Sequence, residues 1–290
     1  MGARRDPRSA PDDGGSARRG REGQKAAVSV ERISGGLDEL GIAADDAQIH
    51  ALHRYMGELA LWNRKRDLVK AEGELLVVRH VLDSLAGLET VRGELERTMA
   101  ARSAGQPGGR TAGEPGTPKA RLFDLGSGGG FPGIPLAVFL PDVQVTLVER
   151  SARKCAFLRG VAAVTGLANI EVMQADYTAI GGAGRESAPE ASSGRASSSS
   201  GPEGGADVGG ADVVVFRALA PIDEELAGNV LQMLRPWGSV VAYKGKYENA
   251  VSEADASRRR FSETEVIPVT VPGLDEQRSL LVLRSFRESS

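Results

Sequence analysis

Short apolar runs alternate with amphipathic segments along the second half of the chain. Runs rich in Val, Leu and Ile predict strands at 122–125, 144–148, 170–173, 213–216 and 239–243. Helical periodicity predicts helices between them at 152–165 and 224–234. Two final runs, 265–271 and 279–286, flank a turn at Pro272-Gly273 and predict an antiparallel hairpin. Since strands that alternate with helices form a parallel sheet covered on both faces, we expect an α/β fold. Its sheet is predicted to be doubly wound, mostly parallel and seven-stranded.

The rest of the chain divides by composition. Residues 28–100 repeat apolar positions with a helical period and predict an N-terminal helical cap in front of the domain at 120–290. Polar residues dominate 1–27, which we expect to be a disordered tail. Gly and Pro predict a linker at 101–119, and Gly, Ala and Ser predict an exposed low-complexity insertion at 181–211.

Composition excludes several classes of site. A single cysteine and three histidines rule out an internal disulfide and a cysteine-rich metal site, and no metal site is expected. No apolar run is long enough to span a membrane, so we expect a cytoplasmic protein, and a monomer. The formal net charge of −3 means that any nucleic-acid surface must be a local patch.

A glycine cluster follows the first predicted strand directly. Asp124 lies at the end of that strand, and Gly126, Gly128 and Gly130 come after it. Glycines let the backbone approach a ligand closely, and amides of the turn and of the next helix face it. Glu149 ends the next apolar run, where a carboxylate can accept hydrogen bonds from both ribose hydroxyls. This layout suits two cofactors, S-adenosylmethionine and NAD.

Pro132 favours the first of these cofactors. The diphosphate of NAD needs free backbone amides, and proline supplies none, whereas S-adenosylmethionine carries no phosphate. The residues therefore favour a methyltransferase. An NAD-linked oxidoreductase stays open as an alternative, although no Tyr-x-x-x-Lys supports it. A nonenzymatic RNA-binding module is the third possibility.

Six separate blocks resemble one family. They are Trp62-Asn63-Arg64-Lys65-Arg66-Asp67-Leu68, Arg79-His80-Val81-Leu82-Asp83-Ser84-Leu85, the glycine block through Pro132-Gly133-Ile134-Pro135, Arg217-Ala218, Lys244-Gly245 and Leu274-Asp275-Glu276-Gln277-Arg278. Together they resemble the bacterial small-subunit ribosomal RNA guanine-N7 methyltransferases, also called the glucose-inhibited division protein B family. The chain departs from the family pattern at Asp67, where asparagine is usual, and at Gly129, where proline is usual. The resemblance implies a class I S-adenosylmethionine-dependent fold that methylates guanine N7 in 16S ribosomal RNA.

Guanine N7 offers a lone pair and no proton, so the reaction needs alignment rather than a general base. Methylation of pyrimidine C5, by contrast, needs a cysteine nucleophile. The only thiol, Cys155, lies among apolar residues of a predicted helix, where we expect it to be buried and not to serve as that nucleophile. Arg217 and Lys244 end two strands at the expected mouth of the sheet and are the candidate catalytic residues. Arg217 would pair with the methionine carboxylate or an RNA phosphate, and Lys244 with an RNA phosphate or guanine O6.

The remaining candidates bind the two substrates. The expected cofactor contacts are Gly126, Gly128, Phe131, Glu149, Asp176, Tyr177, Thr178 and Arg217. Within this set, Asp176 would accept from the adenine amino group. Asp124, which is not in the set, would organise the turn. The expected contacts with ribosomal RNA or a ribosomal particle are Arg64, Lys65, Arg66, Arg79 and Lys244. We also expect His80 to add positive charge and Trp62 to stack on a base.

Overall fold

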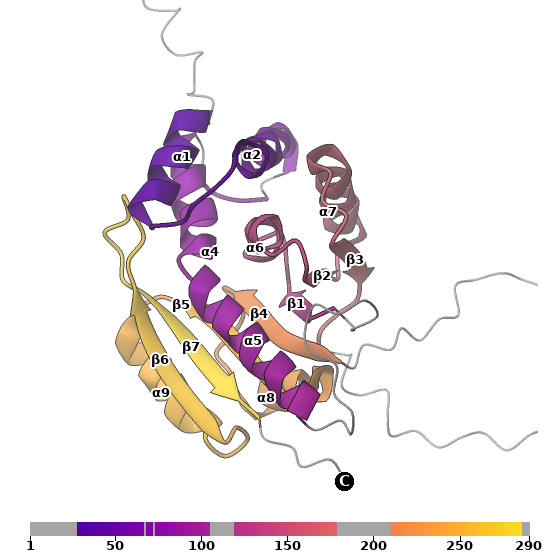
Figure 1. Cartoon of the computed structure of the whole chain (residues 1–290), viewed down its shortest axis with the longest axis vertical. Coiled ribbons are helices and arrows are strands. Elements are labelled where there is room, and N and C mark those ends of the chain that lie inside the picture. The colour runs from indigo at the N-terminus through magenta and orange to yellow at the C-terminus, as the bar shows by residue number, and fades with distance from the viewer. Residues whose placement is uncertain (1–27, 67, 72, 105–118, 179–209, 286–290) are drawn as a thin grey trace, which may run out of the picture.

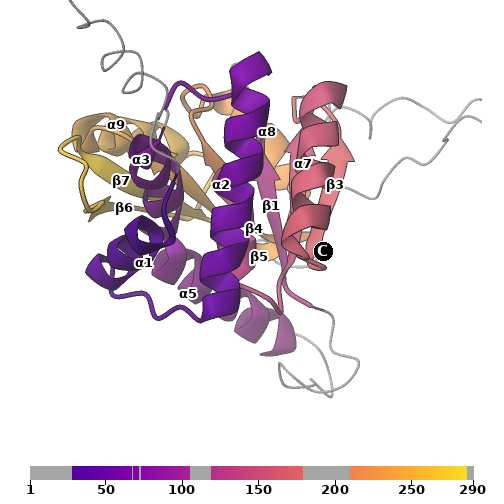
Figure 2. The same cartoon turned by 90° about the horizontal axis from the view of Figure 1, so that it is seen from above.

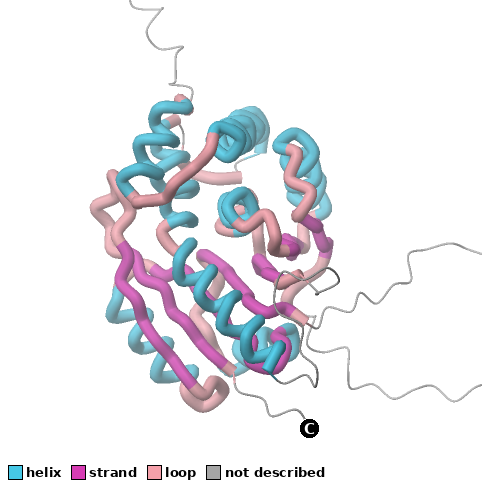
Figure 3. The backbone as a smooth tube through the Cα atoms, viewed as in Figure 1, coloured by secondary structure: helices cyan, strands magenta, loops and turns pink. Residues whose placement is uncertain are grey.

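A seven-stranded sheet with helices on both faces forms the centre of the molecule (Figures 1 and 3). The computed structural model describes residues 28–66, 68–71, 73–104, 119–178 and 210–285. The expected α/β fold with a mostly parallel sheet is confirmed. Among the described residues, no helix is both long and apolar enough to cross a membrane.

The strand order places a switch in chain direction at the middle of the sheet. The strands are β1 (Arg121–Leu125), β2 (Gln144–Glu149), β3 (Ile170–Gln174), β4 (Ala211–Arg217), β5 (Leu234–Lys244), β6 (Glu263–Val269) and β7 (Arg278–Arg284). Their order is β3-β2-β1-β4-β5-β7-β6. β1 to β5 are parallel, and β7 lies antiparallel between β5 and β6. The chain thus winds outward in both directions from β1 and β4, and the crevice at their carboxyl ends is where such folds bind ligands.

Alternate residues of each strand face two different cores. Val213 and Val215 of β4 contribute to one core, and Val214 and Phe216 to the other. The first core lies under α6 (Gly133–Phe139) and α7 (Ala152–Thr165), and the second under α8 (Glu224–Met233) and α9 (Tyr247–Ser257). Because the side chains of residues 213–216 are covered on both faces of the sheet, this part of β4 is apolar throughout, as buried parallel strands are.

The N-terminal helices share the first core instead of forming a separate one. They are α1 (Val30–Glu39), α2 (Asp46–Arg66), α3 (Glu74–Leu76), a π-helix (Val77–Leu82), α4 (Asp83–Leu85) and α5 (Leu88–Ala104). In Figure 2, α2 runs beside α7, where the rings of Trp62 and Phe157 lie 5.4 Å apart. Arg54 of α2 also donates to the Thr165 carbonyl. This packing fixes the helices against the sheet.

Two predicted boundaries are wrong. The expected linker began at 101, yet α5 continues to Ala104 because Arg102 pairs with the buried Asp212 at 3.2 Å. The expected insertion ended at 211, yet Ala211 already belongs to β4. The predicted tail at 1–27 and most of the predicted linker and insertion lie outside the described residues.

Two further differences concern the end of the chain. The α9 helix between β5 and β6 was not predicted. The final hairpin is present with antiparallel pairing, as expected, but its second strand ends at Arg284.

Candidate cofactor and RNA site

The glycine turn leads from β1 into α6 and lies beside the end of β2. Gly126, Gly128 and Gly130 have φ angles of +66°, +56° and +95°, in the region that residues with a side chain rarely adopt. The amides of Gly126 and Ser127 donate to the Val148 carbonyl at 2.8 and 3.1 Å. The turn is therefore tied to the next strand by its backbone. A Cβ on Gly126 would lie 2.9 Å from Leu219, so the loop after β4 packs closely against the turn.

Glu149 supports the turn with both carboxylate oxygens. One oxygen accepts from the Gly128 amide at 3.0 Å and the other from the Ser151 amide at 2.9 Å. The side chain of Ser151 in turn caps α7 by accepting from Lys154. A carboxylate has about four acceptor positions, so Glu149 retains capacity for a ligand while it orders the turn.

Asp124 organises the turn from below, as expected. It is fully buried, and its Oδ2 accepts from the Gly133 amide at 3.1 Å. Burial raises the pKa of this carboxyl to about 7. Its Oδ1 has no hydrogen-bond partner among the described residues. An acceptor that is buried beside a strained glycine turn fits a site that a ligand completes.

The raised pKa of Asp124 predicts a pH-dependent loss of stability. The folded-state pKa lies above the ordinary value of 3.8, so this group's contribution is greatest below pH 3.8 and is lost as pH rises to about 7. Asp124→Asn cannot ionise. From pH 4.5 to pH 8, the free energy of unfolding of the variant should gain at least about 2 kcal/mol relative to the wild type. Denaturant titrations of both proteins at the two pH values measure this relative gain, and the effects of other titrating groups cancel between them. If the difference in free energy of unfolding between variant and wild type is the same at both pH values, the pKa of Asp124 is not raised.

The expected adenine-binding segment follows β3 and lies beside the turn. β3 is parallel to β2, and the Ala175 amide donates to the Glu149 carbonyl at 3.2 Å. Asp176 Oδ1 accepts from the Thr178 amide and hydroxyl at 3.0 and 2.8 Å, so this loop is ordered by its own side chains. The Tyr177 ring lies 3.9 Å from the position of a Cβ on Gly126. The structure thus brings this segment, Glu149 and the glycine turn together.

Arg217 is held by the N-terminal helical region. Its Nη1 donates to Asp83 Oδ2 at 2.9 Å and to the Arg79 carbonyl at 3.0 Å. Its Nη2 donates to His80 Nδ1 at 2.8 Å. Of five N–H donors, these bonds use three, so Nε and one Nη2 proton have no acceptor among the described residues. Arg217 is therefore fixed in place and still able to donate to a ligand.

Phe131 connects the glycine turn to Arg217. Its ring stacks on His80 with centroids 4.7 Å apart, and the Arg217 guanidinium lies 5.1 Å from its centroid. The ring is buried and also packs against Tyr55 at 5.3 Å. Expected as a cover for the methionine arm, Phe131 is thus also the structural link between two parts of the site.

The expectation of positive charge on His80 is wrong. Burial, together with the Arg217 and Arg79 cations, lowers the pKa of His80 to about 3. Because Arg217 donates to Nδ1, the proton of the neutral ring resides on Nε2. His80 is therefore neutral at physiological pH, and its buried Nε2–H has no acceptor among the described residues.

A cavity of about 360 Å³ brings together residues from distant parts of the chain. Its lining includes Arg79, Arg217 and Lys244, as expected of RNA-binding or catalytic groups, and further Lys70, Ala71, His80, Asp83, Ala218, Tyr243, Gly245 and Arg278. Two of its cations pair with glutamates that do not line the cavity. Lys244 contacts Glu253 at 2.6 Å, and Arg79 contacts Glu276 at 2.6 Å. We refer to this space as the Arg217 cavity.

Only one side chain of the predicted basic cluster at the end of α2 can be placed. Arg64 is exposed and does not line the Arg217 cavity, whereas the side chains of Lys65 and Arg66 lie outside the described part of the chain. Trp62 does not have the expected role of a free stacking platform, because its half-buried ring packs on Phe157 and the first core.

Comparison with known proteins identifies the family. A family model described as rRNA small subunit methyltransferase G matches residues 114–192. The ribosomal RNA small subunit methyltransferase G of Cupriavidus necator is 34% identical over 265 residues, which cover 89% of this chain and 95% of the relative. The chain belongs to this family. A protein of the same name from Bordetella pertussis is 31% identical over 259 residues, covering 88% of this chain and 93% of the relative. The family predicted from the six sequence blocks is thereby confirmed.

Three residues of this family member were not singled out as site residues from the sequence. Asp83 accepts from both Arg217 and Arg278, and Tyr55 donates to the Gly129 carbonyl at 2.5 Å. Asp83 and Arg278 both lie in blocks shared with the family, which was the available signal. Cys155 is buried as expected, and its thiol donates to the Glu149 carbonyl.

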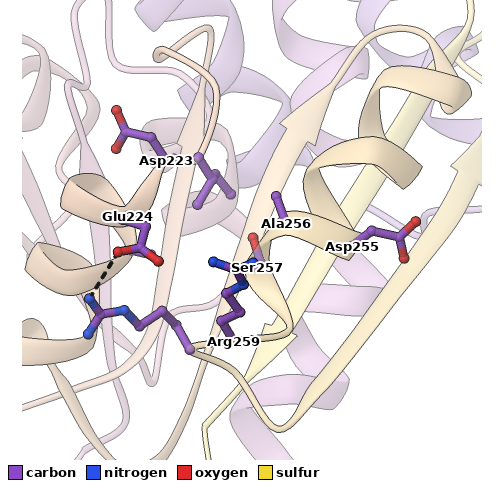
Figure 4. A pocket seen from close by; sticks show the side chains of 9 residues that line it. Asp223, Glu224, Asp255, Ala256, Ser257 and Arg259 are labelled. Carbon is purple, nitrogen blue, oxygen red and sulfur yellow. Dashed lines mark hydrogen bonds and ion pairs between the residues drawn. The ribbon is translucent and has the colours of Figure 1, made fainter.

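A second cavity of about 450 Å³ lies between α8 and α9 (Figure 4). It shares no lining residue with the glycine turn or the Arg217 cavity. Acidic and basic side chains alternate around it, and Glu224 pairs with Arg260 at 3.5 Å. In this family member it carries none of the predicted site residues.

Proposed function

We propose that this chain transfers the methyl group of S-adenosylmethionine to guanine N7 of 16S ribosomal RNA. One observation carries the proposal: Phe131 belongs to the glycine turn and contacts both His80 and Arg217 of the adjoining cavity. A cofactor on the turn and a base in the cavity would therefore be neighbours, as direct transfer requires. Membership of the rRNA small subunit methyltransferase G family supports the same activity.

The turn fits the cofactor. Gly126 and Gly128 would let the backbone approach the cofactor closely, and Glu149 would accept from the ribose hydroxyls. Asp176 would accept from the adenine amino group, with Tyr177 and Thr178 beside the ring. When bound, S-adenosylmethionine supplies a methyl group on a cationic sulfur. NAD fits less well, because Pro132 removes an amide that its diphosphate would need. The oxidoreductase alternative is not favoured.

The cavity fits a reaction at guanine N7 that needs no general base. N7 carries no proton, so no group has to accept one before transfer, and His80 is neutral. Arg217 would hold the methionine carboxylate or the RNA backbone, and Lys244 would donate to O6 or a phosphate, both in the role of alignment. Arg79 would add a phosphate contact at the rim. The partner is then the small-subunit RNA or particle, and we expect the protein to work as a cytoplasmic monomer.

Mapping of N7-methylguanosine tests the proposal. Ribosomal RNA from cells with and without the protein should differ at one guanine, and purified protein should restore that methyl group with S-adenosylmethionine. Calorimetric titration should detect S-adenosylmethionine and not NAD. Identical maps, with no transfer to any ribosomal substrate, would overturn the proposed activity.

The basic cluster at Arg64, Lys65 and Arg66 should act on RNA alone. Replacing all three by alanine should weaken RNA binding and flatten its salt dependence by about one unit of slope per lost phosphate contact. Affinity for S-adenosylmethionine should stay constant, since none of the expected cofactor contacts belongs to the cluster. Filter binding at several salt concentrations measures the slope. Replacing Arg258, Arg259 and Arg260 by alanine provides a control that removes the same charge. Two of these residues, Arg259 and Arg260, line the second cavity. A normal slope in the first variant would leave the cluster an ordinary solvated face.

A further inference from the structure

An aspartate shared by two arginines lies in the wall of the Arg217 cavity. Asp83 Oδ2 accepts from Arg217 Nη1 at 2.9 Å, and Asp83 Oδ1 accepts from Arg278 Nε at 3.0 Å. The aspartate is only 4% exposed. The trio joins the helical region, the end of β4 and the start of β7 at one point. Each arginine is therefore oriented by a charge-assisted bond to the same buried group.

The π-helix brings the aspartate to this point. Val77–Leu82 forms six residues of π-helix between α3 and α4, and it carries Arg79 and His80. Asp83 follows as the next residue. Such wide turns are frequent at functional sites, and they change which side chains share one face of a helix. Here Arg79, His80 and Asp83 all contact Arg217.

Three carboxylates offset part of the positive charge of the cavity lining. Lys70, Arg79, Arg217, Lys244 and Arg278 line it, and Asp83 is the only acidic side chain among its lining residues. Glu253 and Glu276 pair with Lys244 and Arg79 from outside the lining. Arg217 and Arg278 share Asp83. In the described part of the chain, removing the charge of Asp83 would therefore leave Arg217 without a carboxylate partner and Arg278 with only the longer contact to Glu276, at 3.8 Å.

Methylation of N7 moves positive charge into this cavity. The N7 lone pair forms the new N–C bond, and the electron pair of the breaking S–C bond stays on sulfur, with no proton transfer. The base, neutral before the step, becomes a 7-methylguanine cation. Uncompensated cations around it would oppose this change, and a fixed anion would favour it. Neutral His80 is consistent with the same requirement.

Resting on the proposed function, we infer that Asp83 is a positioning residue that orients Arg217 and Arg278 and offsets their charge where the methylated guanine becomes cationic. The inference gives an unusual expectation. Without the Asp83 charge, the cavity is more positive, so RNA should bind as well as before or more tightly, while methyl transfer becomes slower.

Asp83→Asn tests this with Asp212→Asn as the matched control. Asp212 is fully buried and also pairs with two arginines, Arg102 at 3.2 Å and Arg235 at 3.0 Å, but at the other end of β4. Steady-state methyl transfer with saturating ribosomal substrate gives kcat, and filter binding gives RNA affinity. Asp83→Asn should lower kcat roughly tenfold to a hundredfold without weakening RNA binding. The Asp212→Asn protein, measured below its melting temperature, should keep both values.

A second variant separates charge from shape. In the Asp83→Asn background, Arg278→Gln removes one of the two cations that Asp83 pairs with and should recover part of the lost kcat, about fivefold. If Asp83→Asn does not fold, Asp83→Glu, which keeps the charge, should fold and retain more activity than the double variant. Equal losses of kcat and RNA affinity, or no loss, in Asp83→Asn would overturn the inference. Absence of methyl transfer by the wild type would instead overturn the proposed function.

Discussion

Gly133→Ala is expected to destabilise the fold strongly. A Cβ at this position would contact Leu147 Cδ2 and would lie 2.6 Å from Asp124 Oδ2 and 2.9 Å from Asp124 Cβ. These neighbours are buried in the first core or beneath the turn, so they cannot move aside cheaply. The change would also disturb the Gly133–Asp124 hydrogen bond. We expect a loss on the order of 4 kcal/mol, measured by denaturant unfolding.

Two other glycines provide controls for this prediction. Gly160 lies in α7 with nothing within 4 Å of an added Cβ, so Gly160→Ala should raise stability by about 0.5–1 kcal/mol. Gly128 also has space around it, the nearest atom being the Gly126 carbonyl oxygen at 3.6 Å, but its φ is positive. Gly128→Asp should therefore keep the fold while greatly weakening S-adenosylmethionine binding. A well-folded Gly133→Ala protein would show that Asp124 and Leu147 can rearrange.

The strands and the glycine turn were predictable because their signals are local. A buried parallel strand is a short apolar run whatever its partners, so β2 and β4 were found with errors of one or two residues. Helix α7 was found with its correct ends because Ser151 and Gly166 provide capping residues in the sequence. Asp124 and Glu149 were placed correctly since each ends an apolar run beside the turn.

The missed features depend on tertiary contacts. Helix α9 buries only small residues, Ala250, Ala254 and Ser257, and small residues give no strong apolar period. The pairing of Asp83 with Arg217 and Arg278 joins positions 134 and 195 residues apart, which no spacing rule connects.

The two misassigned residues of the site show the same limit. The neutral state of His80 depends on burial and on Arg217. Trp62 was assigned to RNA because basic residues follow it, but the ring packs on Phe157 across the interface between α2 and α7.

Arg217→Ala is expected to give the largest loss of activity. The change leaves His80 Nδ1 and the Arg79 carbonyl without this donor, and it leaves Asp83 with Arg278 alone. It also removes the cation beside Phe131 that links the turn to the cavity. Methyl transfer should fall on the order of a hundredfold or more, because alignment is the main contribution to rate in a reaction without a general base. Arg217→Lys should rescue little, since one ammonium group cannot reach three acceptors in the fixed fork of a guanidinium.

Stability and activity must be measured together for Arg217→Ala. Losing one partner of a nearly buried ion pair should cost about 2 kcal/mol, a value reduced for the partial exposure of Arg217. Arg235→Ala is the matched control, because Arg235 pairs with the buried Asp212 at 3.0 Å at the opposite end of β4. The two variants should melt at similar temperatures, yet only Arg217→Ala should fail in single-turnover transfer. If both lose activity in proportion to stability, Arg217 acts only as a structural tie. If Arg217→Ala alone loses it, the guanidinium aligns the two substrates.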